Sequence, residues 1–264
     1  MTQYLRKEPQ KMRHYSVAHC GLYKAGKSHM MGTYPKPLFI QVDTNRAVGE
    51  AQAAEMIDYT GGTPKEVWED WDRKVLPALY NRDLSVLGIT SPIESVCIDS
   101  YTFLFEVMQE AVAIPKTKQG EDDTFKWYRK LRELAKQHMY KFMSLATPFP
   151  GDSSRPCYNV AIAYHMKAEY RDVANSDKRI MVGYVPAIEG SFKDKIGSYP
   201  GTLLWHEKDG PPEKPNYFCY TKNPDKFKQA DDSVGGKGGH KTLPPKIENT
   251  WDSLMEGWGV GETK

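Results

Sequence analysis

The sequence GLYKAGKS at residues 21–28 satisfies the pattern G-x-x-x-x-G-K-[ST], in which a glycine-rich loop wraps nucleotide phosphates with backbone amides. Gly21 and Gly26 allow backbone angles and a close approach that a β-carbon would block. In this pattern Lys27 reaches the β- and γ-phosphates, and the hydroxyl of Ser28 ligates magnesium. The stretch therefore predicts a site for ATP and Mg²⁺.

The residues on either side of the loop fit the strand and helix that such a loop needs. Residues 14–20 can form a short strand whose side chains alternate between its two faces. Residues from Ser28 onward can begin a helix whose first amides favour phosphate. We count the whole loop as phosphate-binding, so that it includes Leu22, Tyr23, Lys24 and Ala25. Lys24 is an extra positive charge with no assigned partner. The alternative is a glycine-rich strand-to-helix turn with a surface lysine.

Composition sets limits on the class of protein. The chain has 264 residues, a formal charge of +2 and a pI near 8.2, which is too mild to indicate a nucleic-acid-binding protein by itself. Its four cysteines lack metal-ligand or disulfide spacing and resemble reduced intracellular thiols. Neither a signal peptide nor a membrane-spanning run is visible, so we expect a cytoplasmic protein without membrane contact.

The order of sequence patterns predicts an α/β fold with a mostly parallel sheet flanked by helices. Apolar runs at 37–43, 95–100 and 157–164 read as buried strands, and helical patterns separate them, with a capping box at Thr63. Residues 47–58 look loosely helical. Later short strands can run antiparallel. We divide the chain into an N-terminal extension (1–13), a core (14–228), and a flexible glycine-rich loop and tail (229–264).

Three polar residues directly follow predicted strands, where parallel sheets bind ligands. Asp99 is the candidate magnesium-side acid, with a helix N-cap as the alternative role. Asp43 can orient or deprotonate an attacking water, assist magnesium, or simply cap a strand. His165 can hydrogen-bond a γ-phosphate or be structural. With Lys27, these three residues form the predicted catalytic set.

Taken together, these motifs resemble the RecA-like ATPases of phages that include the Sak-type single-strand annealing proteins. The resemblance rests on GLYKAGKS, FIQVD, VCIDS, VAIAYH and later segments that include Pro186 and Gly190, over roughly residues 14–248. It implies a RecA-like P-loop core that binds ATP between subunits of a ring or filament. It also implies single-stranded DNA as a partner, and annealing alongside a single-strand-binding protein. Thr44-Asn45 stands where such proteins often have a glutamate, which puts fast hydrolysis in doubt.

Two basic segments are candidates for binding DNA or a neighbouring subunit. The stretch after His165 offers cations for phosphates and one ring for base stacking, with a solvated loop as the alternative. Its candidate residues are Lys167, Tyr170, Arg171, Lys178 and Arg179. In the second segment, Lys226 and Lys228 can reach the γ-phosphate of a neighbour.

Three functions fit these patterns. The first is a phage DNA-recombination protein with Mg-dependent ATPase activity. The second is a P-loop nucleoside or nucleotide kinase, although the late part of the chain is lysine-rich where a kinase lid needs arginines. The third is an oligomer that binds nucleotide without hydrolysing it.

Overall fold

The computed structural model describes residues 14–43, 55–112, 122–152, 154–173, 178–188, 193, 198–235, 237 and 240–260. Its helices are α1 (Lys27–Gly32), α2 (Pro64–Asp70), α3 (Leu76–Asn81), α4 (Tyr101–Val112), α5 (Asp122–Met143) and α6 (Trp251–Gly257). Its strands are β1 (Ser16–Gly21), β2 (Pro37–Gln41), β3 (Glu55–Asp58), β4 (Ser95–Asp99), β5 (Asn159–Asp172), β6 (Arg179–Pro186), β7 (Thr202–Asp209), β8 (Asn216–Tyr220), β9 (Asp231–Asp232) and β10 (Lys246–Glu248). The N-terminal extension and the Thr44-Asn45 pair lie outside the described residues.

The strands form a mixed α/β structure around one mostly parallel sheet, with the order β10-β8-β7-β1-β5-β4-β2-β3. Strands β7, β1, β5, β4, β2 and β3 run parallel, while β8 and β10 extend the sheet antiparallel at one side. Strand β5 lies between β1, which carries the glycine-rich loop, and β4, which ends in Asp99. The expected α/β class and the mostly parallel sheet are therefore confirmed.

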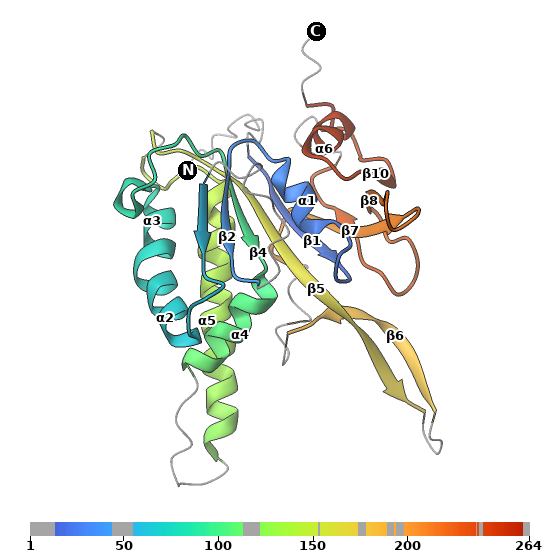
Figure 1. The fold of residues 1–264 in the computed structure, drawn as a ribbon, viewed down its shortest axis with the longest axis horizontal. Coiled ribbons are helices and arrows are strands. Elements are labelled where there is room, and N and C mark those ends of the chain that lie inside the picture. Colours follow the sequence, from blue (N-terminus) through green and yellow to red (C-terminus); the bar gives the residue numbers. More distant parts are fainter. Residues whose placement is uncertain are drawn as a thin grey trace, which may run out of the picture.

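Helices cover both faces of the sheet, because its central strands are apolar on both sides (Figure 1). On one face, Ala18 and Cys20 of β1 pack in a core with residues of α3, α4 and α5. On the other face, Tyr15 and Val17 pack with residues of α1 and α6. Among the described helices, none combines the length and the apolar character needed to cross a bilayer.

Three segments differ from the sequence-based expectation. Residues 55–58 form β3 rather than helix, since a free edge of β2 is available for parallel pairing. Strand β5 does not end at His165 but runs on to Asp172 and pairs antiparallel with β6. The described residues of the segment 229–264, which was expected as a loop and tail, contribute β9, β10 and α6 to the sheet and its core.

The β5–β6 pair projects from the body of the molecule as a two-stranded arm (Figure 1). Residues Tyr170, Ile180 and Val182 of this arm are 57%, 54% and 36% exposed. The basic stretch after His165 is therefore built as strands of an arm and not as a loop at the sheet edge. Lys178, in the same stretch, directly precedes β6.

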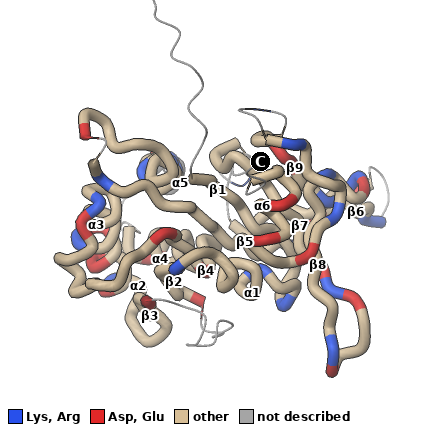
Figure 2. Tube along the Cα trace, turned by 90° about the horizontal axis from the view of Figure 1, so that it is seen from above, with Lys and Arg blue, Asp and Glu red and all other residues tan. Residues whose placement is uncertain are grey.

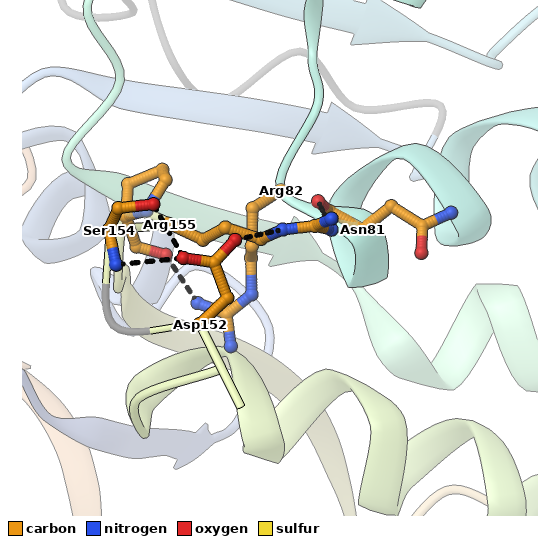
Figure 3. A network of polar contacts seen from close by, with 6 residues as sticks. Asn81, Arg82, Asp152, Ser154 and Arg155 are labelled. Carbon is orange, nitrogen blue, oxygen red and sulfur yellow. Dashed lines mark hydrogen bonds and ion pairs between the residues drawn. The ribbon is translucent and has the colours of Figure 1, made fainter. Parts of the chain in front are cut away.

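The end of α3 is tied to the chain that leads into β5 by the buried side chain of Arg82 (Figure 3). Its Nη1 donates to the carbonyls of Leu145 (2.8 Å) and Pro156 (2.6 Å). Its Nη2 donates to the carbonyls of Ser144 (2.8 Å) and Thr147 (3.1 Å). Burial lowers the pKa of this guanidinium. One charged group thus donates to four backbone carbonyls of this segment, and those of Ser144 and Leu145 also accept from backbone amides.

Substituting Arg82→Ala should lower the free energy of unfolding by about 3 kcal/mol or more, because buried carbonyls lose a charged donor. Arg155 is a control from the same network, where it bonds Asp152 (3.1 Å) and the Asn81 carbonyl (2.7 Å) from a more exposed position (Figure 3). Arg155→Ala should cost only a small part of that loss. Urea unfolding of both variants checks the difference, and equal losses would contradict it.

Candidate functional site

The glycine-rich loop connects β1 to α1, and its two glycines stand where other chain segments come close. A β-carbon on Gly21 would lie 2.8 Å from the backbone oxygen of His206. Gly26 has φ +95°, and a β-carbon there would lie 2.6 Å from Cδ1 of Tyr217. Leu22, Tyr23 and Lys24 form the exposed tip of the loop, whereas Ala25 is buried. The loop shape therefore requires glycine at both expected positions.

Lys27 is the one lysine in the loop that the fold buries, with 4% of its surface exposed. Its ammonium donates to the carbonyls of Gly21 (3.1 Å) and Leu22 (2.9 Å). Burial lowers the pKa of Lys27 to about 8, while the Asp99 and Asp43 carboxylates oppose that shift. The site thus keeps a desolvated cation at the mouth of the loop, next to two acids.

Asp99 comes from the end of β4 and is 2% exposed. The side chain of Ser28 lies close enough to the Asp99 carboxylate to lower its pKa. Burial raises the pKa of Asp99, while Ser28 and the charge of Lys27 act against this rise. The two predicted magnesium ligands are therefore brought close together, although they are far apart in the sequence.

Buried oxygens without a hydrogen-bond partner gather at this edge of the sheet. They include Asp99 Oδ2, Ser100 Oγ and Gln41 Oε1. Gln41 pairs with Asp99 in the β2–β4 register, and both residues lie on the α1 side of the sheet, as Phe39 and Cys97 do. Unpaired buried oxygens are uncommon in folded proteins, and a water molecule or a cation can satisfy them. Sequence analysis missed Gln41, whose signal was one amide in an apolar run.

This donor set fits magnesium. Among the described residues, no group of three or more His, Cys, Asp or Glu side chains forms a metal cage. Magnesium typically needs only one or two carboxylates and takes its other ligands from water and substrate phosphates. Asp99 and Ser28 can hold the ion in this way, with water and a substrate phosphate as its other ligands.

Asp43 and His165 are also brought together. Nε2 of His165 donates to Asp43 Oδ2 at 3.0 Å. The amide of Asp43 bonds the carbonyl of Asp99 (3.1 Å), which fixes the end of β2 against β4. His165 lies beside Gly21 in the β1–β5 register, and its ring lies 5.7 Å from that of Tyr23. The four predicted catalytic residues therefore meet at the carboxyl edge of the parallel strands.

The remaining predicted residues lie elsewhere. The five candidates for DNA contact are on or next to the β5–β6 arm, where Arg179 pairs with Asp172 (2.9 Å). Lys226 is exposed and stands over the ring of Phe227. Lys228 bonds Glu207 (2.6 Å) and Asp225 (3.3 Å) of its own chain. It lines a cavity of about 280 Å³ on the outer side of the loop, together with Tyr23, Tyr184 and Trp205.

Two buried histidines behind the loop were not predicted as site residues. His19 of β1 and His206 of β7 are 0% and 1% exposed, and their rings are hydrogen-bonded. Burial lowers the pKa of His19 well below its ordinary value and lowers that of His206 to about 3. The charge of Lys27 adds to both shifts. Both imidazoles are therefore neutral in the folded protein.

These neutral histidines predict a loss of stability in acid. Below pH about 6.5 a histidine is protonated in the unfolded chain, whereas buried His206 stays neutral in the folded protein. Unfolding is therefore favoured as the pH falls. For His206 this amounts to about 2 kcal/mol at pH 5 relative to pH 8. Urea unfolding at both pH values should show His206→Gln losing that part of the pH dependence. The same substitution at exposed His29 is the control, and an unchanged slope in His206→Gln would contradict the assignment.

Comparison with known proteins assigns neither a fold family nor a function to the chain. No protein-family model matches the chain, and no curated protein matches it. Among solved structures, one match is described as a prototypical ATPase from the type III secretion system of pathogenic bacteria. It shares 10% identity over 72% of this chain and 51% of its own, with a TM-score of 0.39. The chain spans about half the length of that structure. This likeness assigns neither a family nor an activity, and it adds no support for the resemblance to phage annealing proteins.

Proposed function

We propose that the chain binds MgATP at the loop Gly21–Ser28 and hydrolyses it, as a P-loop ATPase with a RecA-like core. The observation that carries the proposal is the placement of buried Lys27 near the charge of Asp99, whose carboxylate has one unpaired buried oxygen. A buried cation beside an incompletely satisfied acid is costly unless a ligand completes the set. A phosphate and its magnesium ion would supply the missing charges and oxygens.

Each residue of the loop site has a role in this proposal. Lys27 exchanges its bonds to the Gly21 and Leu22 carbonyls for bonds to β- and γ-phosphate oxygens. The Ser28 hydroxyl and the Asp99 carboxylate would hold magnesium, which would supply positive charge to the phosphates. Backbone amides of the loop bind the remaining phosphate oxygens.

Asp43 and His165 are proposed to act on the attacking water. Asp43 accepts a hydrogen bond from the water and takes its proton as the water oxygen bonds to the γ-phosphorus and the bond from that phosphorus to the bridging oxygen of the leaving ADP breaks. His165 donates to Asp43 Oδ2 and so fixes the orientation of that carboxylate. Its position beside Gly21 in the sheet supports a place near the γ-phosphate in this proposal.

The finer proposal is that ATP serves a DNA-recombination reaction, with single-stranded DNA bound to the β5–β6 arm of an oligomer. The resemblance to phage annealing proteins and the basic, partly aromatic surface of the arm support it. Figure 2 shows that acids accompany the basic residues near β6, and Glu169 and Asp172 are the acids of β5. Glu169 pairs with Lys193 and Asp172 with Arg179.

Substituting Lys27→Ala should weaken MgATP binding at least about 100-fold, because no other described loop residue places a buried cation at the site. Asp99→Asn should reduce magnesium-dependent turnover more than nucleotide binding. Titration calorimetry and phosphate release measure the two effects.

Lys74→Ala, an exposed lysine on a helical turn, is the control and should bind like the wild type. Unchanged affinity in Lys27→Ala would overturn the proposal. Binding without phosphate release would favour the non-hydrolytic alternative, and phosphorylation of an added nucleoside would favour a kinase.

For DNA, the double variant Lys167→Glu/Arg171→Glu should weaken binding to single-stranded oligonucleotides and reduce the salt slope by about 1.4, since each lost phosphate contact contributes about 0.7. Fluorescence anisotropy at several salt concentrations measures both. Arg129→Glu/Lys130→Glu on the exposed face of α5 is the control of matched charge. Equal losses in the two double variants would remove the arm from the interface.

A further inference from the structure

A line of hydrogen bonds runs behind the phosphate loop, through residues that are nearly or fully buried. Tyr34 Oη lies 3.0 Å from His19 Nε2, and His19 Nδ1 lies 2.9 Å from His206 Nε2. His206 Nδ1 lies 2.7 Å from Asn249 Oδ1, and Asn249 Nδ2 lies 2.7 Å from the carbonyl oxygen of Gly26. The four side chains are at most 3% exposed. The line ends on the loop itself.

Chemistry at the loop end fixes the direction of every bond. The Gly26 carbonyl can only accept, so the amide nitrogen of Asn249 donates to it and the amide oxygen faces His206. His206 must therefore carry its proton on Nδ1, and its Nε2 accepts from Nδ1–H of His19. His19 Nε2 then accepts from the Tyr34 hydroxyl. Only one arrangement of neutral tautomers satisfies all four side chains.

The bond from Asn249 orients a peptide of the loop. A trans peptide is planar, with its C=O and N–H on opposite sides, so the Gly26 carbonyl and the Lys27 amide point in opposite directions. The Gly26 carbonyl accepts two hydrogen bonds, one from Asn249 Nδ2 at 2.7 Å and one from the Met30 amide of α1 at 3.1 Å, and both hold it toward the interior. The Lys27 amide is consequently turned away from Asn249, toward the phosphate side of the loop. Tyr217 packs against Gly26 from the same interior side.

The segment 249–251, which includes Asn249, also contacts the C-terminal end of α1. The amide of Trp251 donates to Oγ1 of Thr33 at 2.7 Å. Its ring lies 4.3 Å from that of Tyr34, the first residue of the hydrogen-bonded line. Asn249 and Trp251 therefore form hydrogen bonds at the start and at the end of α1, and these bonds connect the C-terminal part of the chain to the loop.

We propose that Asn249 is a positioning residue for the phosphate loop, which it aims by holding the Gly26 carbonyl at the end of the directional line Tyr34–His19–His206–Asn249. The expected effect on nucleotide affinity rests on the proposed nucleotide binding, whereas the contact of Asn249 with the loop does not depend on it. Asn249 is not a catalytic residue, since it touches the loop and not the substrate.

The first test uses hydrogen exchange of the full chain without nucleotide. Asn249→Ala should speed exchange of amides in residues 21–31 about 10-fold, because the loop loses a buried bond worth about that factor. Asn159→Ala is the matched control, since Asn159 is 6% exposed and bonds the Tyr15 amide at the start of β1. It should destabilise the protein without a selective effect on the loop. Equal loop exchange in Asn249→Ala and wild type would overturn the proposal.

The second test measures MgATP affinity. Asn249→Ala should bind about 10-fold more weakly than wild type, and isosteric Asn249→Asp more weakly still, because a carboxylate would face the Gly26 carbonyl and repel the phosphates. Asn159→Ala should bind like wild type. Normal affinity in both Asn249 variants would overturn the proposal. If wild type binds no MgATP while Asn249→Ala still loosens the loop, the nucleotide function fails and the positioning role stands.

A third measurement uses the wild-type protein, so it does not depend on whether a variant folds. Nitrogen-15 NMR of histidine-labelled wild type should show His19 and His206 as neutral Nδ1–H tautomers at pH 7. An Nε2–H tautomer at His206 would place two donors or two acceptors face to face in the line and would refute the assigned direction.

Discussion

Burying the ammonium group of Lys27 is the constraint on which the rest of the site depends. A lysine with 4% exposure loses its hydration, which lowers its pKa to about 8, so the fold must surround it with oxygen. The carbonyls of Gly21 and Leu22 supply two contacts, and the carboxylates of Asp99 and Asp43 supply opposite charge. These groups reach one place only because β1, β4 and β2 end at the same edge of a parallel sheet. The sheet topology and the buried charge thus depend on each other.

Features that depend on local sequence were predictable. The loop, its flanking strand and helix, the capping box at Thr63 and the acid at the end of β4 follow from glycine positions, short apolar runs and a cap signature. The contact between Ser28 and Asp99 could be expected because parallel strands place their carboxyl ends together. The length of β5 could not, since residues 166–172 form a strand only through pairing with β6. Likewise, β3 depends on the free edge of β2.

The line behind the loop was invisible in the sequence for a different reason. His19 and His206 are 187 residues apart and Asn249 lies 43 residues further on, and none of the three stands in a motif. Alternation places His19 on the same face as Tyr15 and Val17, where it looks like an ordinary buried residue. Only the pairing of β7 with β1 brings the two imidazoles together. The segment that holds Asn249 falls in a region that composition alone suggested was a tail, which shows how local glycine content can conceal a long-range contact.

The chemical identity of the residue at the end of this line also bears on the charge of the site. An aspartate at position 249 would attract a proton to His206 and create a buried ion pair close to Lys27, at a large desolvation cost. An asparagine satisfies both the imidazole and the Gly26 carbonyl without charge. Because the charge of Lys27 further disfavours protonation of both histidines, the line remains neutral. Lys27 is then the one buried cation that the described loop presents to a phosphate, because neither buried histidine behind the loop carries a positive charge.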